Sequence, residues 1–174
     1  MIPKTVESPV LAHPRARRRP IAALAAGACA VLFGALQLVP APPRTNPPIS
    51  PARRIESVLD VPPRISGFIH RVCANCHSNE TRWPWYSHVA PFSWLVASDV
   101  AKARSAMNFS EWPTRPDGPF RPGAAKLAAA CAVLSFEVMP PPRYRFLHPE
   151  ARPSAAEKQA FCAWTQTLLS TTPH

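Results

Sequence analysis

The sequence predicts a small all-α domain preceded by one transmembrane helix. Three features carry this prediction: a long uncharged apolar stretch near the N-terminus, four later segments with apolar residues at helical spacing, and the lack of any strand-like alternation. The chain has 174 residues, and apolar residues make up 47% of them, which suits one domain with a packed core. We therefore divide the chain into residues 1–20, 21–39, 40–63 and 64–174.

The first helix is predicted over residues 21–39, which read IAALAAGACAVLFGALQLV and follow a basic cluster that ends at Arg19. A helix crosses a bilayer core with about 20 apolar residues, and basic flanks favour the cytoplasmic side. We expect a signal-anchor, with residues 1–20 in the cytoplasm and the rest on the periplasmic side of a bacterial inner membrane. A cleaved signal peptide is the competing interpretation, although its apolar region is shorter, about 7–15 residues.

Proline dominates the next segment. The chain holds 24 prolines against 5 glycines, and eight of the prolines fall between Pro40 and Pro63. Such segments favour extended polyproline II structure. We predict a semi-rigid linker that holds the following domain away from the membrane surface.

Four helices are predicted in the domain, over residues 64–74, 92–107 and 124–138 and from Ser154 onward. The first has apolar side chains at spacings of three, four and seven: Ile65, Phe68, Ile69 and Val72. The third carries a stripe of Leu127, Cys131, Leu134 and Val138. Ser154 and Glu157 form a capping-box pattern at the start of the fourth.

The most informative motif is Cys73-Ala74-Asn75-Cys76-His77. A structural zinc site needs four ligands, usually from two closely spaced pairs, and no second pair is evident. A dithiol redox site expects the same cysteine spacing beside a strand, and none is predicted. Covalent haem needs two thiols for its vinyl groups and an adjacent histidine for its iron, which this motif supplies. Together with the predicted export, the motif predicts one c-type haem, attached through Cys73 and Cys76 and ligated by His77.

A second axial ligand is expected, commonly Met or His in electron carriers. Met139 stands before three prolines, which make a rigid segment suited to aiming a thioether at iron. Core packing is the alternative role for Met139. Met107 is the next candidate, and His70 is a further one. His88 is expected at the surface or in a hydrogen bond, and His148 at a turn.

With these motifs in view, the chain resembles the bacterial haem-binding domain family. The resemblance rests on CANCHSNETRWPWYS, on MNFSEW and on VMPPPRY followed by HPEARPSAAEK, and covers residues 63–169. It implies a membrane-anchored protein with a cytochrome-c-like fold, in which Cys73 and Cys76 attach haem, His77 is the proximal ligand and Met139 the distal one. Pro153 departs from the family pattern, which usually has Leu before Ser154, and affects only a helix entry.

Other residues could support this site. Aromatic side chains after the motif could line either haem or core: Trp83, Trp85, Tyr86, Phe92 and Trp94. Arg82, Trp83 and Tyr86 could donate to a haem propionate, an anion that needs partners. Cys131 and Cys162 could pair in an oxidising compartment, or Cys131 could simply pack in the core.

The sequence therefore predicts an electron carrier rather than an enzyme, because no acid/base pair is evident. The net charge of +10 favours an acidic redox partner, and the lack of a basic run beside aromatic residues argues against nucleic acid. The alternative is a haem-based sensor or small-ligand binder, in which the distal Met is displaced.

Overall fold

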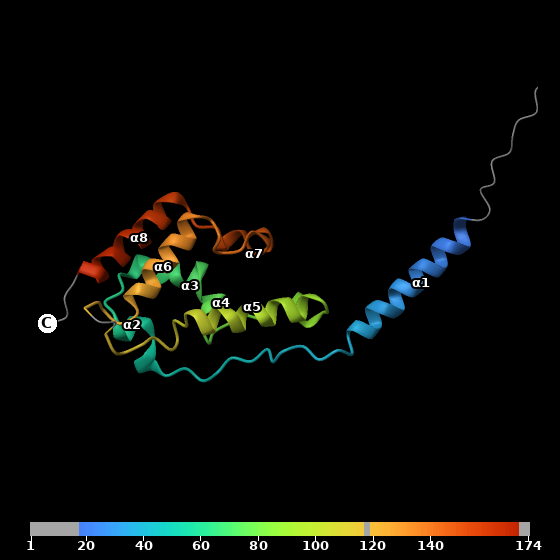
Figure 1. Ribbon diagram of the computed structural model, residues 1–174, viewed down its shortest axis with the longest axis horizontal. Coiled ribbons are helices and arrows are strands. Elements are labelled where there is room, and N and C mark those ends of the chain that lie inside the picture. The colour runs from blue at the N-terminus through green and yellow to red at the C-terminus, as the bar shows by residue number, and fades with distance from the viewer. Residues whose placement is uncertain (1–17, 117–118, 171–174) are drawn as a thin grey trace, which may run out of the picture. The chain divides into compact units, whose positions relative to one another are not determined.

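The computed structural model describes residues 18–116 and 119–170. The chain forms two compact units, Met1–Pro40 and Ala41–His174. Every regular element in the described residues is helical and none is a β-strand, which confirms the all-α prediction (Figure 1).

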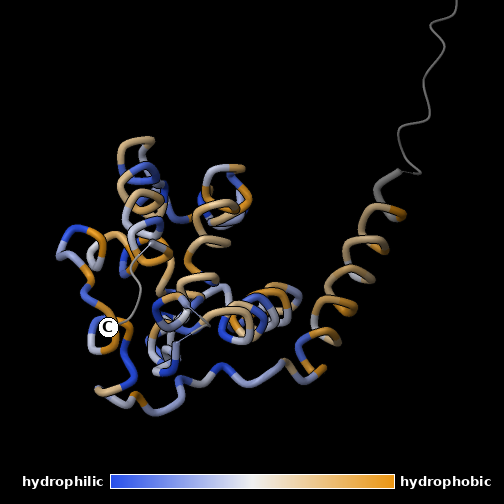
Figure 2. Tube along the Cα trace, turned by 60° about the vertical axis from the view of Figure 1, so that its left-hand side comes forward, coloured by the Kyte–Doolittle hydropathy of each residue, from blue (hydrophilic) through white to orange (hydrophobic). Residues whose placement is uncertain are grey.

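The first unit contains a single helix, α1 (Arg18–Leu36). It begins before the predicted segment and ends three residues earlier, where Gln37 and Leu38 continue as a turn. Apolar residues occupy most of its turns (Figure 2). Its described side chains are almost all exposed. Within the described residues, no helix is both long and apolar enough to span a membrane.

The predicted proline-rich linker differs from the observed structure. After an extended stretch, residues 40–63 contain the short helices η1 (Pro51–Arg53) and α2 (Ile55–Val58). Ile55 and Leu59 are buried in the core of the second unit. The side chain of Arg104 also donates to the carbonyl of Thr45 and to Asn46 Oδ1, at 2.9 and 2.8 Å. The linker prediction rested on the prolines alone. Ile55 and Leu59 lie four residues apart, on one side of a helical turn, and their burial attaches the segment to the domain.

The four predicted helices are all present in the second unit, with shifted ends. They are α3 (Pro63–Val72), α5 (Phe92–Ala106), α6 (Ala124–Ser135) and α8 (Ala155–Ser170). Shorter elements lie between them: α4 (Ala74–His77), η2 (Trp85–His88), α7 (Pro142–Leu147) and η3 (Pro149–Ala151). The capping box at α8 is confirmed, because the Glu157 amide donates to Ser154 Oγ and the Ser154 amide donates to the Glu157 carboxylate, at 3.2 and 2.8 Å.

Helix α6 ends three residues before the predicted boundary because the chain turns there. Glu137 adopts a left-handed conformation with φ of 58°. The Glu137 amide donates to the Leu134 carbonyl and the Val138 amide to the Val133 carbonyl, at 3.1 and 2.9 Å. This pattern is a Schellman motif, which closes a helix and redirects the chain. Val138 consequently leaves the predicted apolar stripe and becomes exposed.

The core lies between α3, α6 and α8. Phe68 of α3 and Phe161 of α8 pack with ring centroids 5.3 Å apart, and Leu127 of α6 is fully buried beside them. Cys131 and Cys162, whose pairing the sequence left open, form a disulfide between α6 and α8. The core therefore fixes α6 and the chain that follows it against the helix that leads into the Cys73 motif.

The start of α6 is fixed by a close approach of two segments. Gly123 has φ of +71°, and a Cβ atom added there would lie 2.5 Å from Trp112 Cζ2. The indole of Trp112 is fully buried, and its Nε1 donates to the Pro122 carbonyl at 2.8 Å. Glycine is thus required both by the backbone conformation and by the contact.

Candidate cofactor site

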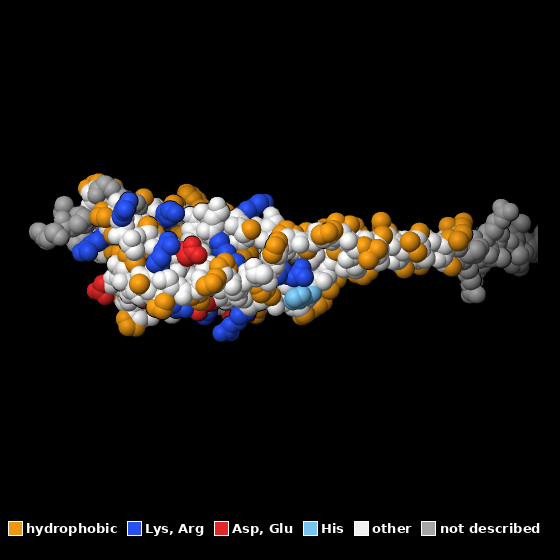
Figure 3. Space-filling model, turned by 90° about the horizontal axis from the view of Figure 1, so that it is seen from below, with side chains coloured by type: hydrophobic (Ala, Val, Ile, Leu, Met, Phe, Trp, Pro, Cys, Tyr) orange, Lys and Arg blue, Asp and Glu red, His pale blue; other side chains and the backbone are white. Residues whose placement is uncertain are grey.

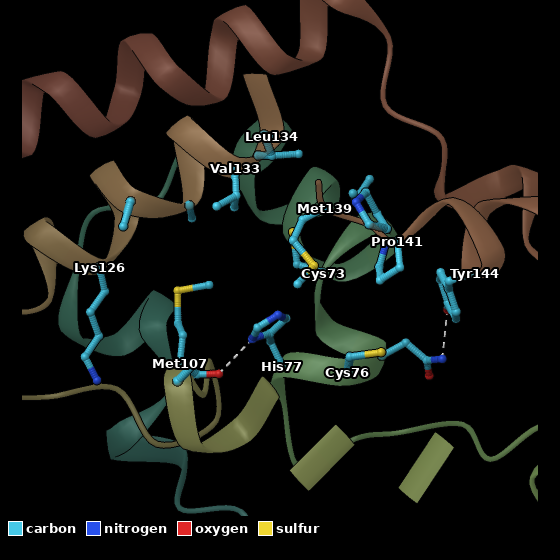
Figure 4. A pocket seen from close by; sticks show the side chains of 16 residues that line it. Cys73, Cys76, His77, Met107, Lys126, Val133, Leu134, Met139, Pro141 and Tyr144 are labelled. Atoms are coloured by element: carbon cyan, nitrogen blue, oxygen red, sulfur yellow. Dashed lines mark hydrogen bonds between the residues drawn. The ribbon is translucent and has the colours of Figure 1, made fainter. Parts of the chain in front are cut away.

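A cavity of about 300 Å³ opens where α3 and α4, the end of α5, helix α6 and the segment 139–144 meet. It is lined by Cys73, Cys76, His77 and Met139, the four residues predicted from the sequence (Figure 4). Most of the remaining lining is apolar, including Val72, Met107, Val133 and Leu134. The structure therefore brings together two thiols, an imidazole and a thioether inside one largely apolar cavity.

The cysteine pair is positioned by a single turn of helix. Helix α3 ends at Val72, and the amides of Cys76 and His77 donate to the Cys73 carbonyl at 3.2 and 3.0 Å. Residues three apart in such a turn lie on the same side of it. The two thiols and the imidazole are consequently presented to one cavity (Figure 4).

Both thiols are held in their neutral form. Burial raises the pKa of Cys73 to about 12 and that of Cys76 to about 11. A reactive dithiol has a lowered pKa, near or below neutrality, so these cysteines do not resemble a redox pair. The described residues also contain no cluster of three or more His, Cys, Asp or Glu side chains that could hold a metal ion, which disfavours the zinc interpretation.

His77 is oriented by a hydrogen bond to the backbone. Its Nδ1–H donates to the Met107 carbonyl at 3.0 Å, which leaves Nε2 with a free lone pair. Burial lowers the pKa of His77, so the ring is neutral and able to ligate a metal. The His77 carbonyl in turn accepts from the Phe109 amide at 2.8 Å, and the Phe109 ring lies edge-on to the imidazole at 6.4 Å.

A largely buried polar network next to His77 joins residues 77–79 to residues 107–110. The Asn79 amide donates to Ser110 Oγ at 3.0 Å, and Asn108 Nδ2 donates to Asn79 Oδ1 at 2.9 Å. Ser78 Oγ donates to the Ala74 carbonyl at 2.6 Å, while Arg104 Nε donates to the Ser78 carbonyl at 2.8 Å. These partnered groups lock the loop that carries the histidine, a role that residue spacing alone did not reveal.

Met139 lines the cavity from the segment that follows α6. Its amide donates to the Val133 carbonyl at 3.2 Å, directly after the Schellman motif, and Pro140 and Pro141 follow it. The residue remains 38% exposed. Tyr144 of α7 then accepts a hydrogen bond from Asn75 Nδ2 at 2.9 Å, which joins this segment to the cysteine motif. Neither Tyr144 nor Asn75 was identified from the sequence.

The other candidate ligands fall in two groups. Met107 lines the cavity, so both methionines considered from the sequence are near the motif. The three histidines do not line it. His70 contacts Glu56 at 3.0 Å, His88 is exposed, and His148 contacts Tyr86 and Glu150 at 2.7 and 2.9 Å in the turn before η3.

The predicted supporting residues lie outside this cavity. Trp85 and Phe92 are exposed, at 79% and 52%, so they wall neither the cavity nor the core. Arg82 and Tyr86 are likewise absent from the lining. Trp83 Nε1 is a buried donor without a partner among the described residues. The aromatic-rich composition of this stretch predicts a wall, but the part of this segment that lines the cavity ends at His77.

The chemistry of the donor set fits haem. Two cysteines with this spacing suit thioether bonds to the two vinyl groups of haem. The Nε2 lone pair of His77 and the sulfur of Met139 are suitable ligands for iron, and an apolar cavity suits a porphyrin ring. The sequence model that describes a haem-binding domain matches residues 31–167. No curated protein and no solved structure matches the chain. The match spans most of the chain, which therefore belongs to the haem-binding domain family.

Proposed function

We propose that the protein is a membrane-tethered, periplasmic c-type cytochrome that carries one haem and transfers electrons without changing a substrate. The observation that carries this proposal is the shared cavity of Cys73, Cys76, His77 and Met139. Two thiols on one helical turn serve attachment, and an imidazole with a thioether serves six-coordinate ligation.

The cysteines provide attachment. Cys73 and Cys76 would each hold the haem by addition to one of its vinyl groups, with a carbon–sulfur bond formed and the thiol hydrogen taken up by the neighbouring vinyl carbon. The addition needs no external oxidant.

The ligands and the cavity set the redox behaviour. When bound, haem supplies an iron that cycles between the ferric and ferrous states. His77 holds its Nε2 toward the cavity through the Met107 hydrogen bond, and Met139 offers a neutral sulfur. A neutral thioether ligand and an apolar cavity both disfavour the more highly charged ferric state. We therefore expect the reduction potential of the haem iron to be raised.

Three observations support the fold and location that we propose. The helical unit around a single CxxCH motif suits a cytochrome-c-like fold. The Cys131–Cys162 disulfide suits an oxidising compartment. The uncharged residues 21–39 after a basic cluster suit an inner-membrane signal-anchor.

The charge distribution bears on the redox partner, which we propose to be acidic. The net charge is +10, and Lys and Arg side chains are spread over the face of the folded unit in view (Figure 3). Such a surface accelerates encounter with an acidic partner, an effect that weakens as ionic strength rises.

The optical spectrum of the ferric protein tests this function. Methionine ligation gives c-type cytochromes a weak far-red absorption band. We expect the wild type to show it, Met139→Ala to lose it, and the matched variant Met107→Ala to keep it. A five-coordinate, high-spin spectrum in the wild type would instead favour the haem-based sensor or ligand binder, and loss of the band only in Met107→Ala would move the ligand to that residue.

A further inference from the structure

One charged side chain lines the cofactor cavity, and it belongs to Lys126. The residue lies in the first turn of α6, which begins at Ala124, and is exposed. No hydrogen bond or ion pair joins Lys126 to another side chain in the part of the chain that the structure describes. Its charge is therefore available to a bound group.

Lys126 lies at the end of the cavity remote from the cysteines. Figure 4 shows Cys73 and Cys76 on one side, with His77 and Met107 between them and Lys126. In haem the vinyl and propionate groups occupy opposite edges of the porphyrin. If the vinyl edge is fixed at the two cysteines, the propionate edge extends across His77 toward Lys126.

We propose that Lys126 binds a haem propionate through an ammonium–carboxylate ion pair, an inference that rests on the proposed covalent haem. The carboxylate is an anion that the otherwise uncharged cavity lining cannot stabilise, and a charge-assisted hydrogen bond to Lys offsets its desolvation. The residues considered for this role from the sequence do not line the cavity: Arg82, Trp83 and Tyr86.

The direction of the electrostatic effect follows from the charges. A cation beside the propionate favours its ionised form, so removing the cation makes the propionate harder to ionise. The same cation favours the ferrous iron, which carries one positive charge less, so removing it lowers the midpoint potential. Both effects arise at the haem and are measurable in protein whose haem remains attached.

The test is a spectroelectrochemical titration of the haem over a range of pH. In Lys126→Met we expect a lower midpoint potential and a propionate titration shifted upward by about one pH unit. Lys126→Arg should retain the wild-type titration. The matched control is Lys102→Met, an equal charge change on an exposed residue of α5 that does not line the cavity. Methionine is a good helix former, so both Met variants should fold.

Two results would overturn the inference: superimposable titrations for Lys126→Met and wild type, or equal shifts in Lys126→Met and Lys102→Met. Acid–acetone extraction of each sample separates this failure from failure of the proposed function. Haem that stays on the chain while Lys126→Met has no effect contradicts only the propionate contact. Haem that leaves the wild-type chain contradicts covalent attachment as well.

Discussion

The two walls of the cofactor cavity are built in different ways. The wall that carries Cys73, Cys76 and His77 stands on buried residues, and its histidine is fixed by Met107 and Phe109. The wall that carries Met139 is a surface turn, in which Val138 is 54% exposed and Phe136 80% exposed. It is held by a few backbone hydrogen bonds, the Cys131–Cys162 disulfide and an ion pair between Lys158 and Glu137 at 3.1 Å.

This difference suggests separate roles for the two walls: the firmly held wall suits the proposed attachment of haem, and the surface turn suits exchange of the proposed Met139 ligand. A buried wall would keep the thiols and imidazole in place in both redox states of the proposed haem. A turn with few buried contacts opens at lower free energy than a core segment. Changes to the wall that carries Cys73 should therefore reduce stability strongly, whereas changes to the wall that carries Met139 should act mainly through the disulfide and the proposed Met139 ligand.

The largest contrast should come from two matched phenylalanines. Phe109 is 4% exposed beside His77, and Phe136 is 80% exposed before Met139. Phe109→Ala leaves a cavity and should lower the free energy of unfolding by about 3–5 kcal/mol. Phe136→Ala should change it by less than about 0.5 kcal/mol. Chemical denaturation of the full chain in detergent measures both, and equal losses would show that the two walls are equally supported.

The disulfide should have the next largest effect. Cys131 and Cys162 are separated by 31 residues, and opening a loop of this size lowers the free energy of unfolding by about 3–4 kcal/mol in the chain-entropy estimate. The variant with both residues changed to Ser should show this loss and also weaken the far-red band, while its haem stays attached. Cys29→Ser, which removes an unpaired thiol of α1, should leave stability unchanged. A double variant as stable as wild type would contradict the claim that the disulfide supports the wall that carries Met139.

A smaller effect is expected from the ion pair that joins α8 to the end of α3. Glu157 accepts from the Ser154 amide and hydroxyl and pairs with Arg71, two residues before Cys73. These contacts hold the pKa of Glu157 below its ordinary value of 4.5. A carboxyl group whose pKa is lower in the folded chain stabilises the fold at pH values above its pKa in the unfolded chain. This contribution is lost as the pH falls through its pKa in the folded chain. Wild type should therefore lose more stability than Glu157→Gln on acidification below pH 4.5, as thermal melts can measure; parallel losses would refute the linkage.

The sequence predicted well what depends on local spacing. Helical periodicity located α3, α5, α6 and α8, and the capping box located the start of α8. The motif at Cys73 predicted which side chains share one helical turn, and these side chains line one cavity. These features involve residues within a few positions of each other, so the pattern carries most of the information.

Features that depend on distant residues were not predictable in the same way. The Asn75–Tyr144 hydrogen bond and the Asn79–Asn108 contact join segments far apart in the chain. Whether Cys131 packs or pairs depends on how α6 lies against α8. The linker prediction failed for a related reason, since the partners of Ile55 are supplied by the folded domain.

The central claim is that Cys73 and Cys76 hold haem covalently. Its most direct test combines acid–acetone extraction with intact-mass measurement on the full chain produced with a haem-attachment system. We expect that haem stays with the chain and that the measured mass equals the chain plus one haem. The double variant Cys73→Ser with Cys76→Ser should lose this mass increment. Haem in the acetone phase together with the bare chain mass would contradict it.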